Sequence, residues 1–183
     1  MFNDERDYMF ESGKAYGGDI TFDFKYKGLN IKAIYSLGWV KRYDGIIHYA
    51  PHFDRRHNIN FLCSYGFGKR RSWQIDLRWN FGSGFPFTQT QAYYPQMNIT
   101  SFDINYVTAN ESVSFILADY NKGKLPNYHR LDISAKKSFY IKKRHVIDVS
   151  VGVTNLYNYK NVFYKDRISN ETIYQLPILY SLG

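Results

Sequence analysis

The sequence predicts an all-β fold whose antiparallel strands are of the transmembrane β-barrel type. Apolar and polar residues alternate over runs of about ten residues, the length a tilted strand needs to cross a bilayer, whereas soluble strands average about 5–6. Short and long connections between these runs alternate strictly. Aromatic residues make up 19% of the chain, and transmembrane barrels gather such rings in girdles at both membrane interfaces.

The first predicted strand pair follows a polar stretch that ends near Gly13. The apolar members of its first strand are Ile20, Phe22, Phe24 and Tyr26. A tight turn is expected at Lys27-Gly28, because glycine suits a turn position with positive φ, and the return strand begins at Leu29. The alternation ends near Leu37, so residues 37–56 are predicted to be a long connection.

The second pair is predicted at His57–Tyr65 and Trp73–Phe81, joined by a turn over Gly66–Arg71. Its second strand has the most regular alternation in the chain; the apolar members are Trp73, Ile75, Leu77, Trp79 and Phe81. The region from Gly82 to Asn127 is then expected to be a very long loop with room for a short hairpin of its own.

The third pair is predicted at Tyr128–Phe139 and His145–Asn155, joined by the basic turn Tyr140–Arg144. Another long segment follows Asn155, so about six to eight strands are expected in all. This number cannot close a large barrel by itself. We therefore expect a partial barrel: a curved sheet with two unpaired edges, short turns on one side and long extracellular loops on the other.

Two other architectures remain open at this level: a soluble β-sandwich that binds a ligand, and a passive porin-like barrel. The mean hydropathy of −0.47 does not exclude a barrel, because the lumen-facing half of each strand is polar. No apolar run approaches the roughly 18 residues of a transmembrane helix. Loops beyond about 12–15 residues are uncommon in compact soluble domains, which favours the membrane barrel.

Several short motifs, weak singly, occur in an informative order. They are Gly17-Gly18-Asp19, Pro51–His57, Gly82–Thr88, Leu125–Ser134, Gly152–Asn158, Asn161–Tyr164 and Leu176–Leu179. In this order and spacing the chain resembles the C-terminal part of the barrel of TonB-dependent outer-membrane receptors, most closely those of the Bacteroidetes type. The resemblance extends over nearly the whole chain.

The resemblance implies a cell outer-membrane receptor that imports a nutrient with energy delivered by TonB. It implies a barrel of roughly 22 strands around an N-terminal plug domain, contacts with outer-membrane lipid, and a small-molecule, glycan or peptide substrate, and it is compatible with a surface lipoprotein partner. The start of the chain has no features of a signal peptide. We therefore expect residues 1–183 to be the C-terminal segment of such a receptor barrel, without the plug.

The residues give no sign of an enzyme, a metal centre, a cofactor or a nucleic-acid partner. The five histidines are scattered, the single cysteine Cys63 lies among apolar alternating residues, and Gly82-Ser83-Gly84 lacks the strand-to-helix setting of a nucleophile elbow. The basic clusters Lys69–Arg71 and Lys142–Arg144 fall in short turns, where we expect them to face periplasmic lipid headgroups rather than nucleic acid.

Ligand recognition is expected in the long loops, because loops on a rigid scaffold carry most binding residues. The candidate ligand-contacting residues are Trp39, Arg42, Tyr43, Tyr49, Phe85, Phe87, Tyr93 and Tyr94. The same side chains could instead pack the loops together or form the outer aromatic girdle, and the sequence does not separate these alternatives.

Overall fold

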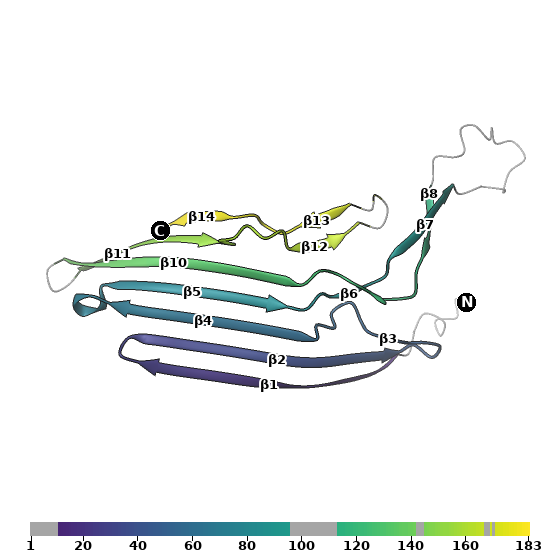
Figure 1. Cartoon of the computed structure of the whole chain (residues 1–183), viewed down its shortest axis with the longest axis horizontal. Coiled ribbons are helices and arrows are strands. Elements are labelled where there is room, and N and C mark those ends of the chain that lie inside the picture. The colour runs from purple at the N-terminus through teal and green to yellow at the C-terminus, as the bar shows by residue number, and fades with distance from the viewer. Residues whose placement is uncertain (1–10, 96–112, 142–144, 167–168, 170) are drawn as a thin grey trace, which may run out of the picture.

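The structure is a computed structural model that describes residues 11–95, 113–141, 145–166, 169 and 171–183. Figure 1 shows a single long antiparallel sheet with small hairpins beyond one of its ends. The strand order is β1-β2-β4-β5-β10-β11-β14, and β3 adds to the end of β2. No α-helix occurs in these residues. The prediction of an all-β antiparallel fold with about six to eight main strands is therefore confirmed.

The long strands of this sheet are 10–15 residues long. They are β1 (Ser12–Tyr26), β2 (Leu29–Tyr43), β4 (His57–Phe67), β5 (Trp73–Gly82), β10 (Tyr128–Ile141) and β11 (His145–Thr154). Two shorter strands complete the sheet, β3 (His48–Tyr49) and β14 (Leu179–Leu182). Three separate two-stranded sheets pair β6 (Pro86–Phe87) with β9 (Gly123–Lys124), β7 (Thr90–Pro95) with β8 (Val113–Leu117), and β12 (Val162–Lys165) with β13 (Thr172–Tyr174).

Short turns lie at one end of the sheet and long connections at the other, as predicted (Figure 1). We call these the short-turn end and the loop end. At the short-turn end, Lys27 and Gly28 have φ of 42° and 97°, the backbone of a tight hairpin turn. The turn between β4 and β5 contains a 3₁₀ turn, Lys69–Arg71. The basic residues Lys142–Arg144 lie outside the described residues.

The strand register brings most of the apolar side chains of the long strands onto one surface, which we call the apolar face. Residues directly opposite each other on neighbouring strands share a face. One such row crosses the whole sheet: Phe24, Ile31, Cys63, Leu77, Ile133, Val153 and Tyr180. The apolar positions predicted from the alternation in each strand therefore lie on the same face of the sheet. Cys63 belongs to this face as expected.

The opposite surface, the polar face, carries the intervening residues. In one of its rows, Asp23, Lys32, Leu62, Arg78 and Asp132 stand opposite one another on successive strands. Thr154 continues this row one position beyond the first paired residues of β10 and β11. Most of its members are charged or hydroxyl-bearing, so the sheet divides into two chemically different surfaces.

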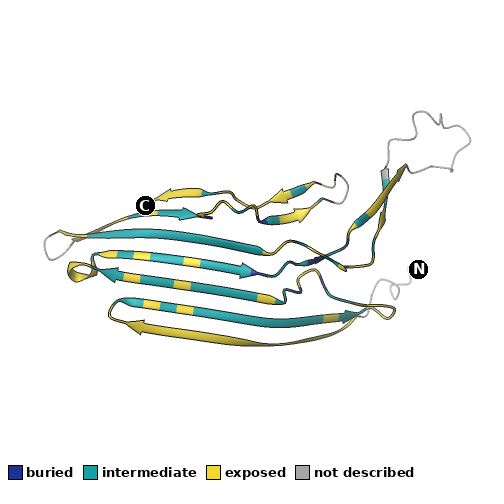
Figure 2. Ribbon diagram, in the orientation of Figure 1, coloured by how far each residue is buried: buried dark blue, intermediate teal, exposed yellow. Residues whose placement is uncertain are grey.

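Neither face has a dry core over it. Among the described residues no apolar side chain is buried, and large ones such as Ile20, Val146 and Val151 are more than half exposed. Figure 2 shows most strand residues as exposed or intermediate and the buried residues at the loop end. Within the described segments, no helix is long and apolar enough to span a membrane.

The sheet is open in the described residues. The ladder path runs from β1 to β14 without a pairing between these two strands. Within the described residues, β1 and β14 therefore each have one edge without a ladder partner.

Several strands are longer than the sequence pattern predicts. The largest difference is in β2, which continues to Tyr43 although the alternation predicts a loop from Leu37, and β3 then pairs with its end. The ladder to β1 holds this segment extended, since Gly18 to Ser12 pair one for one with Leu37 to Tyr43. Smaller extensions occur in β4, to Phe67, and in β10, to Ile141, so that two residues of the expected basic turn are strand.

Candidate functional site

The connections at the loop end are held by buried polar side chains rather than by apolar packing. Asp54, with 6% of its surface exposed, accepts a hydrogen bond from the backbone N–H of Val40 at 3.0 Å. Its other oxygen lies 3.4 Å from a guanidinium nitrogen of Arg56. Because the carboxylate bonds a strand and a connection together, it fixes the segment before β4 against the end of β2.

A second buried tie joins two different loops. Asn121 donates from its amide to the carbonyl oxygen of Ala50 at 2.9 Å, and its backbone N–H donates to the hydroxyl of Thr88. Tyr49 and Tyr120 make an edge contact between the same two regions, with ring centroids 4.8 Å apart. The loops therefore form a joined surface at this end of the sheet.

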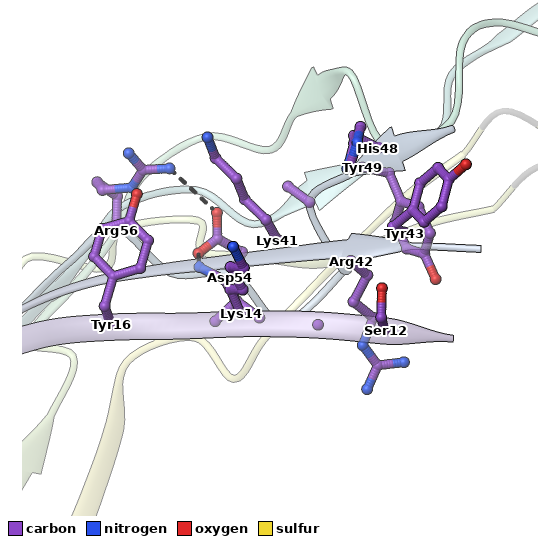
Figure 3. Close-up of a pocket in the computed structure, with 13 residues that line it drawn as sticks. Ser12, Lys14, Tyr16, Lys41, Arg42, Tyr43, His48, Tyr49, Asp54 and Arg56 are labelled. Carbon is purple, nitrogen blue, oxygen red and sulfur yellow. Dashed lines mark hydrogen bonds and ion pairs between the residues drawn. The ribbon is translucent and has the colours of Figure 1, made fainter. Parts of the chain in front are cut away.

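A pocket of about 750 Å³ lies where β1, β2, β3 and the Asp54 segment meet (Figure 3). We call it the lysine pocket, because Lys14 and Lys41 stand directly opposite each other on β1 and β2 at its wall. The other labelled lining residues are Ser12, Tyr16, Arg42, Tyr43, His48, Tyr49, Asp54 and Arg56. Three of the eight predicted ligand-contacting residues, Arg42, Tyr43 and Tyr49, are thus brought together here.

Two of these three residues, Arg42 and Tyr49, are hydrogen-bonded to another residue of the chain, Glu11. Glu11 accepts hydrogen bonds from Arg42 at 2.9 Å and from the hydroxyl of Tyr49 at 2.8 Å. This bond to the Glu11 carboxylate raises the pKa of the Tyr49 hydroxyl. The arrangement favours the role of loop packing for Arg42 and Tyr49, because their polar atoms already have partners.

Tyr43 is also engaged by its own turn. Its ring stacks on His48 with centroids 4.5 Å apart, and its hydroxyl donates to the carbonyl of Gly45 at 2.7 Å. The turn is closed by the Asp44 carboxylate, which accepts the backbone N–H groups of Ile46 and Ile47. These bonds lower the pKa of Asp44, because they favour its ionised form.

Trp39 lies outside this pocket, on the apolar face. It stands opposite Tyr16 on β1, and the two rings stack with centroids 5.4 Å apart. The guanidinium of Arg56 lies 5.0 Å from the centre of the Trp39 ring. Trp39 is therefore engaged by Tyr16 and Arg56 and does not line the lysine pocket.

The other four predicted residues lie in the long connection between β5 and β10. Phe87 belongs to β6, and Tyr93 and Tyr94 are exposed on β7, which leads away from the sheet. Phe85 lies instead beneath the guanidinium of Arg55, 4.1 Å from ring centre to carbon. The structure therefore separates the eight residues into several locations rather than one site.

A second pocket, of about 500 Å³, opens on the polar face at the loop end. We call it the arginine pocket, because Arg55, Arg78 and Arg130 line it, together with Asn58, Asn60, Asn80, Phe85, Tyr128 and Gln175. Of these only Phe85 is among the eight predicted ligand-contacting residues. The run Asp54-Arg55-Arg56 directly before a strand was the available signal, but spacing alone does not show which arginine turns to which face.

The histidines at the loop end interact with tyrosines. The Tyr35 hydroxyl lies 2.9 Å from Nδ1 of His57, and the Tyr157 hydroxyl lies 2.9 Å from Nδ1 of His129. In the described part of the chain no three His, Cys, Asp or Glu side chains are grouped so that they could hold a metal ion. Each of these two histidines thus has a tyrosine hydroxyl within hydrogen-bond distance.

No protein-family model matches this chain, and neither does any curated protein or any solved structure.

Proposed function

We propose that this chain forms part of the wall of an outer-membrane β-barrel, with its apolar face against lipid and its polar face toward the lumen. The observation that carries this proposal is the unbroken register of apolar residues across the sheet. Such a face must be covered by something apolar. Among the described residues no second layer packs on it, and a bilayer supplies that cover directly.

The dimensions of the apolar face support a membrane. On β5, Trp73 and Phe81 mark its two aromatic margins, eight residues or about 27 Å apart along the strand. A strand tilt of about 40° reduces this to about 21 Å, comparable with the apolar band of about 25 Å in outer-membrane barrels. Leu77 stands midway between the two rings and would lie near the centre of the bilayer.

The short-turn margin carries a second feature typical of an interface. Lys137 points from the apolar face, but its amine lies 4.5 Å from the centre of the Trp73 ring and bonds the hydroxyl of Ser72 at 3.1 Å. A lysine whose stem lies along apolar surface while its amine reaches the turn is positioned to place its charge at a headgroup boundary.

We further propose that this barrel belongs to a TonB-dependent receptor. The motif order and the alternation of short turns with long connections support a TonB-dependent receptor, whose plug and TonB contact would lie in other parts of the polypeptide. A nutrient, whether a small molecule, a glycan or a peptide, would then reach the lumen from the loop end, and a surface lipoprotein could cover that entrance.

The single cysteine offers a direct test of the barrel wall. Cys63 lies on the apolar face, and Ser64 lies next to it on the polar face of the same strand. A spin label would be attached to Cys63 in the full-length protein in lipid vesicles, and to the thiol introduced at position 64 in the matched Cys63→Ala, Ser64→Cys variant. We expect the label at position 63 to collide with oxygen, which concentrates in lipid, and the label at position 64 to collide with a water-soluble nickel chelate.

Equal water accessibility at both positions, or a compact water-soluble monomer without detergent, would contradict the proposed barrel wall and favour a soluble ligand-binding module. The receptor class has its own test. If the barrel forms, loss of TonB in the native host should abolish the uptake that this protein supports, whereas uptake that persists would indicate a passive porin-like barrel.

A further inference from the structure

The arginine pocket contains more positive charge than its surroundings neutralise. Its walls hold three guanidinium groups, and none of the described residues that line it is acidic. Arg130 is paired with Asp132, with a nitrogen to oxygen distance of 3.0 Å. That carboxylate also accepts the backbone N–H of Asn155, so it is already engaged. In the described segments no carboxylate is within ion-pair distance of Arg55 or Arg78.

Arg55 is held in place without a counter-ion. Its guanidinium lies over the ring of Phe85 at 4.1 Å and faces the ring of Tyr128 at 5.7 Å. It also lies so close to Gly82 that a Cβ there would stand 2.6 Å from its central carbon. Its Nε is buried and has no hydrogen-bond partner.

Burial lowers the pKa of the Arg55 guanidinium, which reflects the cost of removing this charge from water. An arginine nonetheless stays protonated near neutral pH. A positioned, partly desolvated guanidinium with free donors is a group that an oxyanion would stabilise.

Arg78 lines the arginine pocket from the sheet itself, on β5. It stands on β5 directly opposite Asp132 of β10, and Asn80, the next residue on the same face, stands opposite Arg130. The amide of Asn80 donates to that of Asn60 on β4 at 2.6 Å. The nearest acidic residue along β5, Asp76, receives two hydrogen bonds from Gln74. The pocket therefore offers guanidinium donors beside neutral amides, without a free carboxylate.

We propose that the arginine pocket binds the oxyanion of a ligand, a carboxylate or a phosphate ester, between Arg55 and Arg78, with the neighbouring asparagine amides available to adjacent hydroxyl groups. The proposal rests on the proposed function, because the polar face at the loop end is where a substrate would enter the lumen. It narrows the substrate class to anionic compounds.

The test uses three sugars that share one ring and differ in charge: glucuronate, glucose 6-phosphate and uncharged glucose, with inorganic phosphate as a fourth probe. The full-length protein is purified in detergent, heat-modifiable gel mobility establishes that the barrel is formed, and binding is measured by isothermal titration calorimetry. We expect glucuronate or glucose 6-phosphate to bind at least about tenfold more tightly than glucose, with affinity that falls as salt rises.

Variants locate the binding. Arg55→Gln and Arg78→Gln should each weaken oxyanion binding by about tenfold or more. Lys25→Gln removes the same charge from the polar face at its short-turn end and should leave the affinity unchanged. Binding of inorganic phosphate alone, unaffected by Arg78→Gln, would overturn the site.

The two proposals fail differently. A formed barrel that binds glucuronate, glucose 6-phosphate and inorganic phosphate no better than glucose would overturn the oxyanion site while the barrel wall stands. A protein without heat-modifiable mobility and with a water-exposed apolar face would overturn the proposed function, and this site would fall with it.

Discussion

The side-chain amide of Asn161 pairs with the backbone of His129 as a neighbouring strand would. Its Nδ2 donates to the His129 carbonyl at 2.9 Å, and its Oδ1 accepts the His129 N–H at 2.9 Å. The pairing of β10 with β11 begins only at Ile133, four residues further along. Asn161 therefore satisfies the edge of β10 at the point where β11 has already ended, and it anchors the segment that leads into β12.

Replacing this amide should weaken the loop end of the sheet. Asn161 is 3% exposed, and Asn161→Ala would leave the part-buried N–H and carbonyl of His129 without these partners. We expect a loss of about 1–3 kcal/mol in the free energy of unfolding, measured by urea-dependent loss of heat-modifiable mobility. Asn30→Ala, at an exposed position of β2, is the matched control and should change stability by less than about 0.5 kcal/mol. Equal effects of the two changes would contradict the proposed role of Asn161.

The two faces of the sheet predict opposite responses to a new charge. Ile133 stands opposite Leu77 near the middle of the apolar face, and Ser134 stands opposite Asp76 on the polar face. Ile133→Arg should cost about 2–4 kcal/mol in a bilayer, because it places a guanidinium at the midplane. Ser134→Arg should cost far less. Folding into vesicles from urea measures both, and similar penalties would be inconsistent with the assignment of the faces.

Gly82 and Gly84 differ in what an added side chain would meet: at one position another side chain, at the other the backbone. A Cβ at Gly82 would meet the guanidinium of Arg55, the mobile end of a side chain, whereas a Cβ at Gly84 would meet the carbonyl of Leu125. Gly82→Ala should therefore leave the unfolding midpoint nearly unchanged and weaken oxyanion binding, because Arg55 must move. Gly84→Ala should destabilise the fold by more than about 1 kcal/mol, since backbone must shift.

If Gly82→Ala instead bound glucuronate or glucose 6-phosphate as tightly as the native protein does, the position of Arg55 over Gly82 would be irrelevant to the pocket. The same titration that tests Arg55→Gln measures this outcome.

The Asp44 turn should depend on pH. Its carboxylate pKa is below 3.8 in the folded chain, because the N–H groups of Ile46 and Ile47 bond the ionised form. A depressed pKa stabilises the turn above 3.8, and this contribution is lost as pH falls through the lower folded value. Deuterium exchange of residues 44–47, compared with Asp44→Asn at each pH, should show full extra protection above pH 3.8, which declines as the pH falls through the lower folded pKa. The same ratio at all pH values would contradict this role of Asp44.

The sequence predicted the strands best where one side of each strand is apolar. Period two located β5 to within one residue, since Trp73 to Phe81 alternate without a break. It failed for the end of β2, where Lys41 and Tyr43 continue the positions that are apolar lower in the strand. Backbone pairing with β1 keeps this segment extended, and pairing across strands cannot be read from a local pattern.

The candidate sites were less predictable for a related reason. Aromatic residues in loops were correctly expected at the loop end, but Arg42 and Tyr49 are engaged by Glu11, a partner 31 and 38 residues away. Arg55 and Arg56 are adjacent in sequence, yet Arg55 lies over Phe85 in the arginine pocket and Arg56 lies over Trp39 on the apolar face. Such assignments depend on the path of a connection, which composition and spacing do not determine.

The two lysines of the lysine pocket, Lys14 and Lys41, are expected to repel each other. Lys14 and Lys41 are exposed and directly opposite on β1 and β2, one row beyond the stacked Tyr16 and Trp39. Like charges at directly opposed positions repel, so Lys41→Gln should raise the free energy of unfolding by about 0.2–1 kcal/mol at low salt. Lys14→Gln should do the same, and the double change should gain less than the sum, because one substitution already removes the repulsion. A loss of stability in either single variant would mean that the two charges do not oppose each other, and the advantage should disappear in high salt if repulsion is its cause.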